Sequence, residues 1–86
     1  MDNFVHFLNI HRKDDLPTIN FDADKMVDHM PGERVELHAE LIAKDTLLCI
    51  TSYVFDKKTD DHLRTTQWLY PLSDVLEINY RINDEL

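Results

Sequence analysis

The stretch Arg34-Val-Glu-Leu-His-Ala-Glu-Leu-Ile-Ala43, followed after Lys44-Asp45 by Thr46-Leu-Leu-Cys-Ile-Thr-Ser-Tyr-Val-Phe-Asp56, decides the fold. In the first segment apolar and polar residues alternate, which is the period of a strand with one buried face. The second segment is apolar on both faces, as in a central strand that is covered on both sides. The short connection between the segments predicts an antiparallel hairpin.

Weaker patterns flank this hairpin. Residues 2–13 fit a helix or a strand, and their Phe, Val and Ile content favours the strand. Asp22 is the predicted N-cap of a short helix over about residues 22–30, which Pro31-Gly32 ends. Alternation predicts further strands at 62–70 and 75–82, joined by a tight connection. The expected fold class is α+β: a four- to five-stranded, mostly antiparallel sheet with a β-meander over residues 34–82 and one short helix.

The chain of 86 residues is expected to form a single domain over residues 1–86. Its longest uncharged apolar run, residues 46–55, is too short to cross a bilayer, and the first residues lack the pattern of a signal peptide. The one cysteine, Cys49, lies in the predicted central strand and has no partner for an internal disulfide. A cytoplasmic location is therefore expected.

The central strand needs more cover than the helix provides. A helix of about eight residues is roughly 12 Å long, whereas an eleven-residue strand spans roughly 36 Å. Leaving Leu48, Ile50 and Val54 in water would forgo about 1.5–3 kcal/mol for each side chain. The remaining cover comes either from the N-terminal segment or from a second subunit, so a homodimer is one hypothesis.

The chain is strongly acidic, with 17 Asp and Glu against 9 Lys and Arg and a net charge of −8. Direct binding to nucleic acid is disfavoured, because it requires a basic footprint that displaces counterions. The same charge favours attraction to a basic protein surface, although excess acid also serves solubility alone. A membrane is not an expected partner.

Carboxylates gather before the first hairpin strand, along its outward face and in the turn after the second strand. Carboxylates that are fixed on a sheet and a helix can imitate phosphates, so the expected target is a basic nucleic-acid-binding site, for example on an enzyme. The preferred function is therefore a non-catalytic acidic binding module, such as a phage-type inhibitor that mimics nucleic acid. A merely solvated acidic face is the alternative, and the residues alone favour it slightly over mimicry. The candidate protein-binding residues are Asp14, Asp15, Asp22, Asp24, Asp28, Glu36, His38, Glu40, Asp56, Asp60 and Asp61.

Enzymatic chemistry is poorly supported, and no metal or other cofactor is expected. The five histidines lack the spacing of metal ligands, and one cysteine cannot build a zinc site. Cys49 has no obvious activating base, and the single Gly32 excludes glycine-rich phosphate loops. The alternative from another class is a small-ligand or metal-dependent enzyme that uses His38 and nearby carboxylates.

The stretch Val35 to Ile78, which ends Trp68-Leu-Tyr-Pro-Leu-Ser-Asp-Val-Leu-Glu-Ile78, resembles the strand pattern of the YolD-like and other Sm-like small barrels. In those proteins the last strand often follows a turn of this kind. The resemblance covers half of the chain, and it departs where such sequences tend to have glycine, here Ser52. It implies a small-barrel accessory protein as a further alternative and carries no functional residues.

Overall fold

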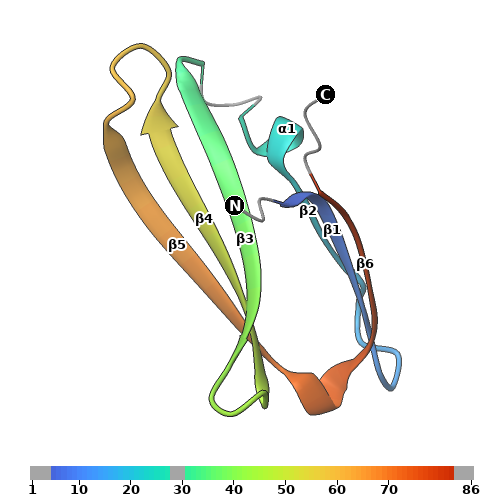
Figure 1. Ribbon diagram of the computed structural model, residues 1–86. Coiled ribbons are helices and arrows are strands. Elements are labelled where there is room, and N and C mark those ends of the chain that lie inside the picture. Colours follow the sequence, from blue (N-terminus) through green and yellow to red (C-terminus); the bar gives the residue numbers. More distant parts are fainter. Residues whose placement is uncertain (1–4, 28–30, 83–86) are drawn as a thin grey trace.

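The computed structural model describes residues 5–27 and 31–82. In these ranges the chain is mostly antiparallel sheet with one short α-helix, as the sequence predicts (Figure 1). The elements in chain order are β1 (Val5–Arg12), β2 (Ile19–Asp22), α1 (Ala23–Met26), β3 (Glu33–Ile42), β4 (Leu47–Asp56), β5 (His62–Pro71), the 3₁₀ turn η1 (Leu72–Asp74) and β6 (Val75–Ile82). No helix in the described ranges is long and apolar enough to span a membrane.

The sheet curls into an open half-barrel with two halves. One half is β3–β4–β5, and in the other half β1 lies between β2 and β6. The halves meet where Val5 of β1 pairs with Leu37 of β3, and η1 carries the chain from β5 across to β6 at the opposite end (Figure 1). The inner sides of both halves therefore face each other across one core.

The predicted hairpin is confirmed. β3 and β4 pair from Glu33 opposite Asp56 to Ile42 opposite Leu47 without a register shift. In the turn, Lys44 and Asp45 have left-handed backbone angles, φ 56° and 65°. The Thr46 hydroxyl donates a hydrogen bond of 2.7 Å to the carbonyl oxygen of Ala43 and so closes the turn.

The order of the outer strands differs from the expected meander. β3, β4 and β5 form a meander, but β6 pairs with β1 instead of continuing it. The reason is the corner at η1, where Leu72 donates its N–H to the Thr46 carbonyl oxygen at 2.9 Å. This corner directs β6 to the other half, where Ile78 packs on the core. β2, for which the sequence showed no strand pattern, completes that half.

The core explains how the central strand is covered. Leu48, Ile50 and Val54 of β4 are buried, and Leu8 and Ile10 of β1 join Leu48 and Ile50 in one cluster. Partly buried side chains from β6, α1 and β3 pack around this cluster, among them Val75, Ile78, Ala23, Met26 and Val35. The N-terminal strand and the last strand thus supply the cover that the helix cannot.

The helix is shorter than expected. Asp22 is its N-cap, as predicted, and its carboxylate accepts the backbone N–H groups of Asp24 and Lys25 at 3.0 and 3.4 Å. The described helix ends at Met26, with Val27 as C-cap. Asp28, a candidate binding residue, lies outside the described residues.

Candidate functional site

The outer face is the side of β3–β4–β5 that points away from the core. On β3 the outer face consists of the residues that alternate with buried Leu37. On β4 it consists of the residues that pair with them, for example Phe55 opposite Arg34 and Tyr53 opposite Glu36. Its members from β3 are Arg34, Glu36, His38 and Glu40, from β4 Cys49, Thr51, Tyr53 and Phe55, and from β5 Thr65, Gln67 and Leu69. The face combines acidic, aromatic and hydroxyl side chains on a regular sheet.

Arg34 organises the acidic end of the outer face. Its guanidinium contacts the carboxylates of Glu36 and Asp60, and its Nε donates to Asp60 at 3.0 Å. The guanidinium carbon also lies 4.3 Å from the ring centroid of Phe55. The hydrogen bonds that Arg34 donates to Asp60 and then to Glu36 raise the pKa of its guanidinium above the ordinary value. One cation therefore fixes two carboxylates, one from β3 and one from the turn between β4 and β5.

An aromatic row runs beside these carboxylates and consists of His38, Tyr53, His62 and Phe55. His38 and Tyr53 are in edge contact with centroids 5.1 Å apart, and His62 lies 6.3 Å from Tyr53 and 5.6 Å from Phe55. His62 Nε2 is hydrogen-bonded to the Thr65 hydroxyl at 2.6 Å. These contacts hold the rings in place, and fixed rings can receive apolar or cationic groups of a partner.

The β4–β5 turn, residues 56–61, carries the next carboxylates. Asp56 accepts the backbone N–H groups of Lys58 and Thr59 at 2.8 and 3.0 Å. The hydrogen bonds from Thr59 and then Lys58 lower the pKa of the Asp56 carboxyl. Asp60, with φ 64°, lies in the turn that brings its carboxylate to Arg34. Lys57 and Lys58 offset part of the negative charge of this turn.

The remaining predicted residues lie elsewhere. Asp14 and Asp15 lie in the β1–β2 turn with left-handed backbone angles, at the opposite end of the molecule from the β4–β5 turn (Figure 1). Asp22 caps α1, and Asp24 is paired with His6 at 3.0 Å. The structure thus places Glu36, His38 and Glu40 on one face of β3 and Asp56, Asp60 and Asp61 in the β4–β5 turn. It brings Glu36 and Asp60 together at Arg34, whereas Glu40 lies farther along the strand and Asp14 and Asp15 lie apart.

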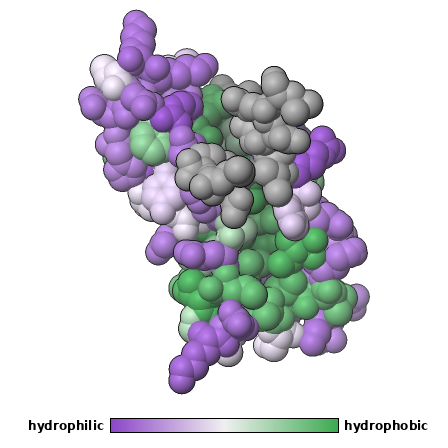
Figure 2. Space-filling model, in the orientation of Figure 1, coloured by the Kyte–Doolittle hydropathy of each residue, from purple (hydrophilic) through white to green (hydrophobic). Residues whose placement is uncertain are grey.

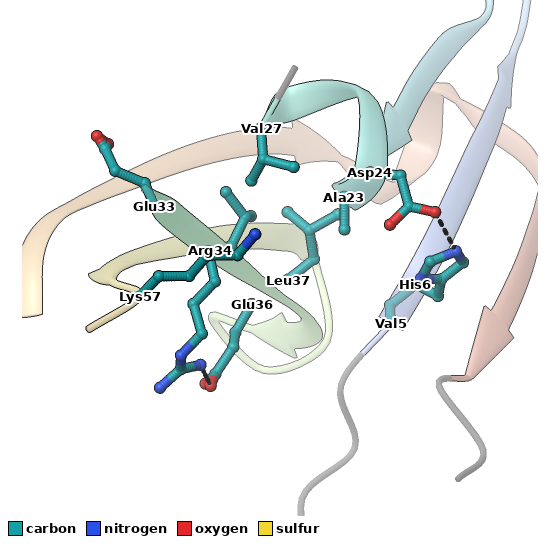
Figure 3. A pocket seen from close by; sticks show the side chains of 11 residues that line it. Val5, His6, Ala23, Asp24, Val27, Glu33, Arg34, Glu36, Leu37 and Lys57 are labelled. Atoms are coloured by element: carbon teal, nitrogen blue, oxygen red, sulfur yellow. Dashed lines mark hydrogen bonds and ion pairs between the residues drawn. The ribbon is translucent and has the colours of Figure 1, made fainter. Parts of the chain in front are cut away.

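A groove of about 620 Å³, lined by charged and apolar side chains, opens between α1, the start of β1 and the first half of β3 (Figure 3). His6 and Asp24 lie on one side of it, and Arg34 and Glu36 lie on the other (Figure 3). Glu33, which also lines it, is bound by Arg64 at 2.7 Å. The groove thus separates the contact between His6 and Asp24 from the ion pair between Arg34 and Glu36.

An apolar groove of about 590 Å³ lies between the second half of β3 and β6. Figure 2 shows this area as a continuous apolar patch on the lower half of the face that it draws, whereas the upper left of that face is hydrophilic. Its lining residues are Val5, Leu8, Ala39, Glu40, Leu41, Leu48, Leu72, Ile78 and Tyr80. The groove is an opening of the core at the seam between the two halves.

A metal-dependent enzyme that uses His38 would need further metal ligands beside this residue. No three His, Cys, Asp or Glu side chains come together as a metal site anywhere in residues 5–27 and 31–82. The Cys49 thiol is buried, and its Sγ lies 3.6 Å from the Thr51 hydroxyl.

The sequence analysis did not identify Arg34, Tyr53 and Phe55 of the outer face, or His62 of the aromatic row, as residues of the site. The signal for two of them was present, because a turn centred on Lys44-Asp45 fixes the register that sets Arg34 opposite Phe55. The position of His62 depends on the register shift between Val54 and Phe55, which the sequence does not indicate.

Comparisons of the chain with protein-family models, with curated proteins and with solved structures find no match.

Proposed function

We propose that the protein is a non-catalytic binding module that holds a basic surface of another protein against its outer face. The observation that carries this proposal is the Arg34 network, which fixes Glu36 and Asp60 next to the aromatic row. Ordered carboxylates and rings lose little freedom when a partner binds, and such preorganisation favours affinity. The rings provide contact area, and the carboxylates provide selectivity for cations.

The overall charge supports a basic partner. At −8 the chain attracts basic surfaces over long range, which speeds association and makes it sensitive to salt. Phe55 already accepts one guanidinium on its ring, so the same kind of contact is open to Arg or Lys side chains of a partner at the other rings.

The finer form of the proposal is an inhibitor that mimics nucleic acid. Residues of one face repeat along a strand every roughly 6.7 Å, which is about two phosphate steps along one strand of duplex DNA. Glu36 and Glu40 are therefore separated by about four such steps, and Asp60 and Asp61 extend the carboxylates beyond the strand. A partner that binds nucleic acid in a basic groove would accept this spacing.

The test compares two double variants of equal charge. Glu40→Gln/Asp61→Asn removes two carboxylates from the outer face and its turn, whereas Asp14→Asn/Asp15→Asn removes two from the far end. Immobilised wild-type protein is expected to capture proteins from a lysate at low salt and release them at high salt. The outer-face variant should lose most of this capture, and the far-end variant should retain it. Equal losses in both variants would show that only net charge matters.

Competition separates mimicry from simple attraction. If the captured protein binds nucleic acid at the same groove, duplex DNA should displace it from the wild-type protein at constant ionic strength. Salt at the same ionic strength, without DNA, is the control. Capture that DNA leaves unchanged would contradict the nucleic-acid mimic and would leave only the coarser proposal of a basic partner.

A further inference from the structure

β5 forms an outer edge of the sheet. It pairs with β4 along its length, and no other described strand pairs with it (Figure 1). Its side chains are exposed except at Trp68 and Tyr70, and Leu63 and Leu69 remain 46% and 53% exposed. After a register shift at its start, the pairing with β4 is regular from Arg64 to Pro71. A ten-residue strand with an open row of backbone donors and acceptors is thus available for pairing.

The other open edges carry more protection. β2 has only four residues, and β6 carries the charged residues Glu77 and Arg81. β3 pairs with β1 at Leu37, and its open part after Leu37 carries Glu40. Short strands and charged side chains are the usual devices that keep sheet edges apart. The segment Thr65–Pro71 of β5 contains no charged residue. Among the described strands, β5 is therefore the edge best suited to accept another strand.

We propose that the β5 edge pairs with the β5 edge of a second copy of this chain, in antiparallel orientation, and joins the two sheets into one. Charge selects the orientation. A parallel pair would bring the acidic turns 56–61 of both copies side by side, whereas an antiparallel pair places them at opposite ends, separated by roughly 33 Å for ten residues. The interface between the copies is then free of like charges.

The side chains fit this self-pairing. Two registers oppose almost the whole of β5 to itself, one centred on Thr66 over residues 62–70 and one centred on Gln67 over residues 63–71. Arg64 then lies opposite Trp68 of the partner or opposite Tyr70 of the partner, so no like charges oppose each other in either register. In both registers residues of the same face oppose each other, so the sheet continues without interruption.

The dimer would also extend the proposed binding face. The two-fold axis between two antiparallel strands is perpendicular to the sheet, so both outer faces point to the same side. This inference does not depend on the proposed function, because the pairing follows from the edge itself. Because β1 and β6 cover the inner face of β4, a second copy is not needed to bury that face, and the apolar groove at the seam is the competing surface that the experiment tests through β6.

The experiment is a measurement of solution mass over a concentration series by sedimentation or light scattering. Wild-type protein is expected to have twice the mass of one chain at tens of micromolar. The double variant Thr66→Lys/Gln67→Lys places two lysines directly opposite each other in either register, and should raise the dissociation constant at least about tenfold. Wild-type protein that keeps the mass of one chain throughout the series would overturn the proposal.

The matched control is Leu76→Lys/Tyr80→Lys on β6. Both residues are well exposed, at 66% and 59%, and Tyr80 lines the apolar groove. The control adds the same charge, so it should remain dimeric while the β5 variant becomes monomeric. A dimer that survives the β5 variant, or that only the β6 variant dissociates, would contradict pairing at β5. Far-ultraviolet circular dichroism confirms that each variant is folded.

Cross-linking decides the case in which both double variants dissociate. In a Cys49→Ala background, Thr66→Cys and Gln67→Cys each place a single thiol at the centre of one register. A short thiol-reactive cross-linker should join two chains through at least one of these positions, and through neither Leu76→Cys nor Tyr80→Cys. Covalent dimers that form only through the β6 positions would assign the interface to β6 and overturn the proposal.

Discussion

The two halves of the sheet differ in regularity. β3 and β4 pair over ten residues each without a register shift, and this half carries the outer face. In the other half, β1 pairs with β6 with register shifts between Val5 and Phe7 and between His11 and Arg12. Irregular pairing of this kind increases local twist and bends strands. The β3–β4 pair therefore displays side chains at even spacing, whereas the bends in the other half close the core.

The largest expected loss of stability comes from substitutions in the core, and it tests whether both halves share that core. Ile50 of β4 and Ile10 of β1 are completely buried. Ile50→Ala and Ile10→Ala should each lower the free energy of unfolding by about 2–5 kcal/mol, because each leaves a cavity in the same cluster. Denaturant unfolding measures both values. A loss below about 1 kcal/mol for Ile10→Ala alone would mean that the β1 half contributes little to the core.

A smaller effect separates the surfaces of the two halves. Arg34→Ala removes contacts to two carboxylates and to Phe55, and should lower the free energy of unfolding by about 1 kcal/mol, a modest value because the side chains are partly in solvent. Arg81→Ala is the counterpart, since Arg81 lies over Phe7 at 5.7 Å in the other half. Its loss should be clearly smaller in the same unfolding assay. Equal losses of unfolding free energy in the two variants would show that the Arg34 contacts stabilise the fold no more than the Arg81 contact does.

The smallest effect is a dependence on pH in the regular half. Backbone hydrogen bonds lower the pKa of Asp56 in the folded chain, so its stabilising contribution is present above the unfolded pKa and disappears as pH falls through the folded value. Asp56→Asn should therefore show a smaller decrease in melting temperature between neutral and acid pH than the wild-type protein. Asp14→Asn, in the turn of the other half, is the control. Identical acid profiles for wild type and Asp56→Asn would contradict this assignment.

The sequence predicts the regular half well and the irregular half poorly. Alternation in residues 34–56 and one short turn determine both the strands and their register, and Asp22 is recognisable as an N-cap. The partner of β6 could not be predicted, because its choice of β1 depends on the corner at η1 and on packing across the core. The candidate site was predicted as the row Glu36, His38 and Glu40 on one strand and as separate groups of carboxylates elsewhere. What joins Glu36 to Asp60 is Arg34, through a contact between residues that are 26 positions apart.

The pairing of β1 with β6 has a consequence for how the chain acquires its structure. These strands come from the two ends of the described chain, with Ile10 opposite Ile78. A contact of such long sequence separation closes a large loop, which slows folding relative to a sheet of local hairpins. During synthesis the β3–β4 hairpin and the pairing of β1 with β2 can form early, whereas the other edge of β1 pairs only after β6 has been made. Until β1 and β6 cover it, the apolar side of the β3–β4 hairpin is exposed to water, and at this stage the chain is most prone to aggregation.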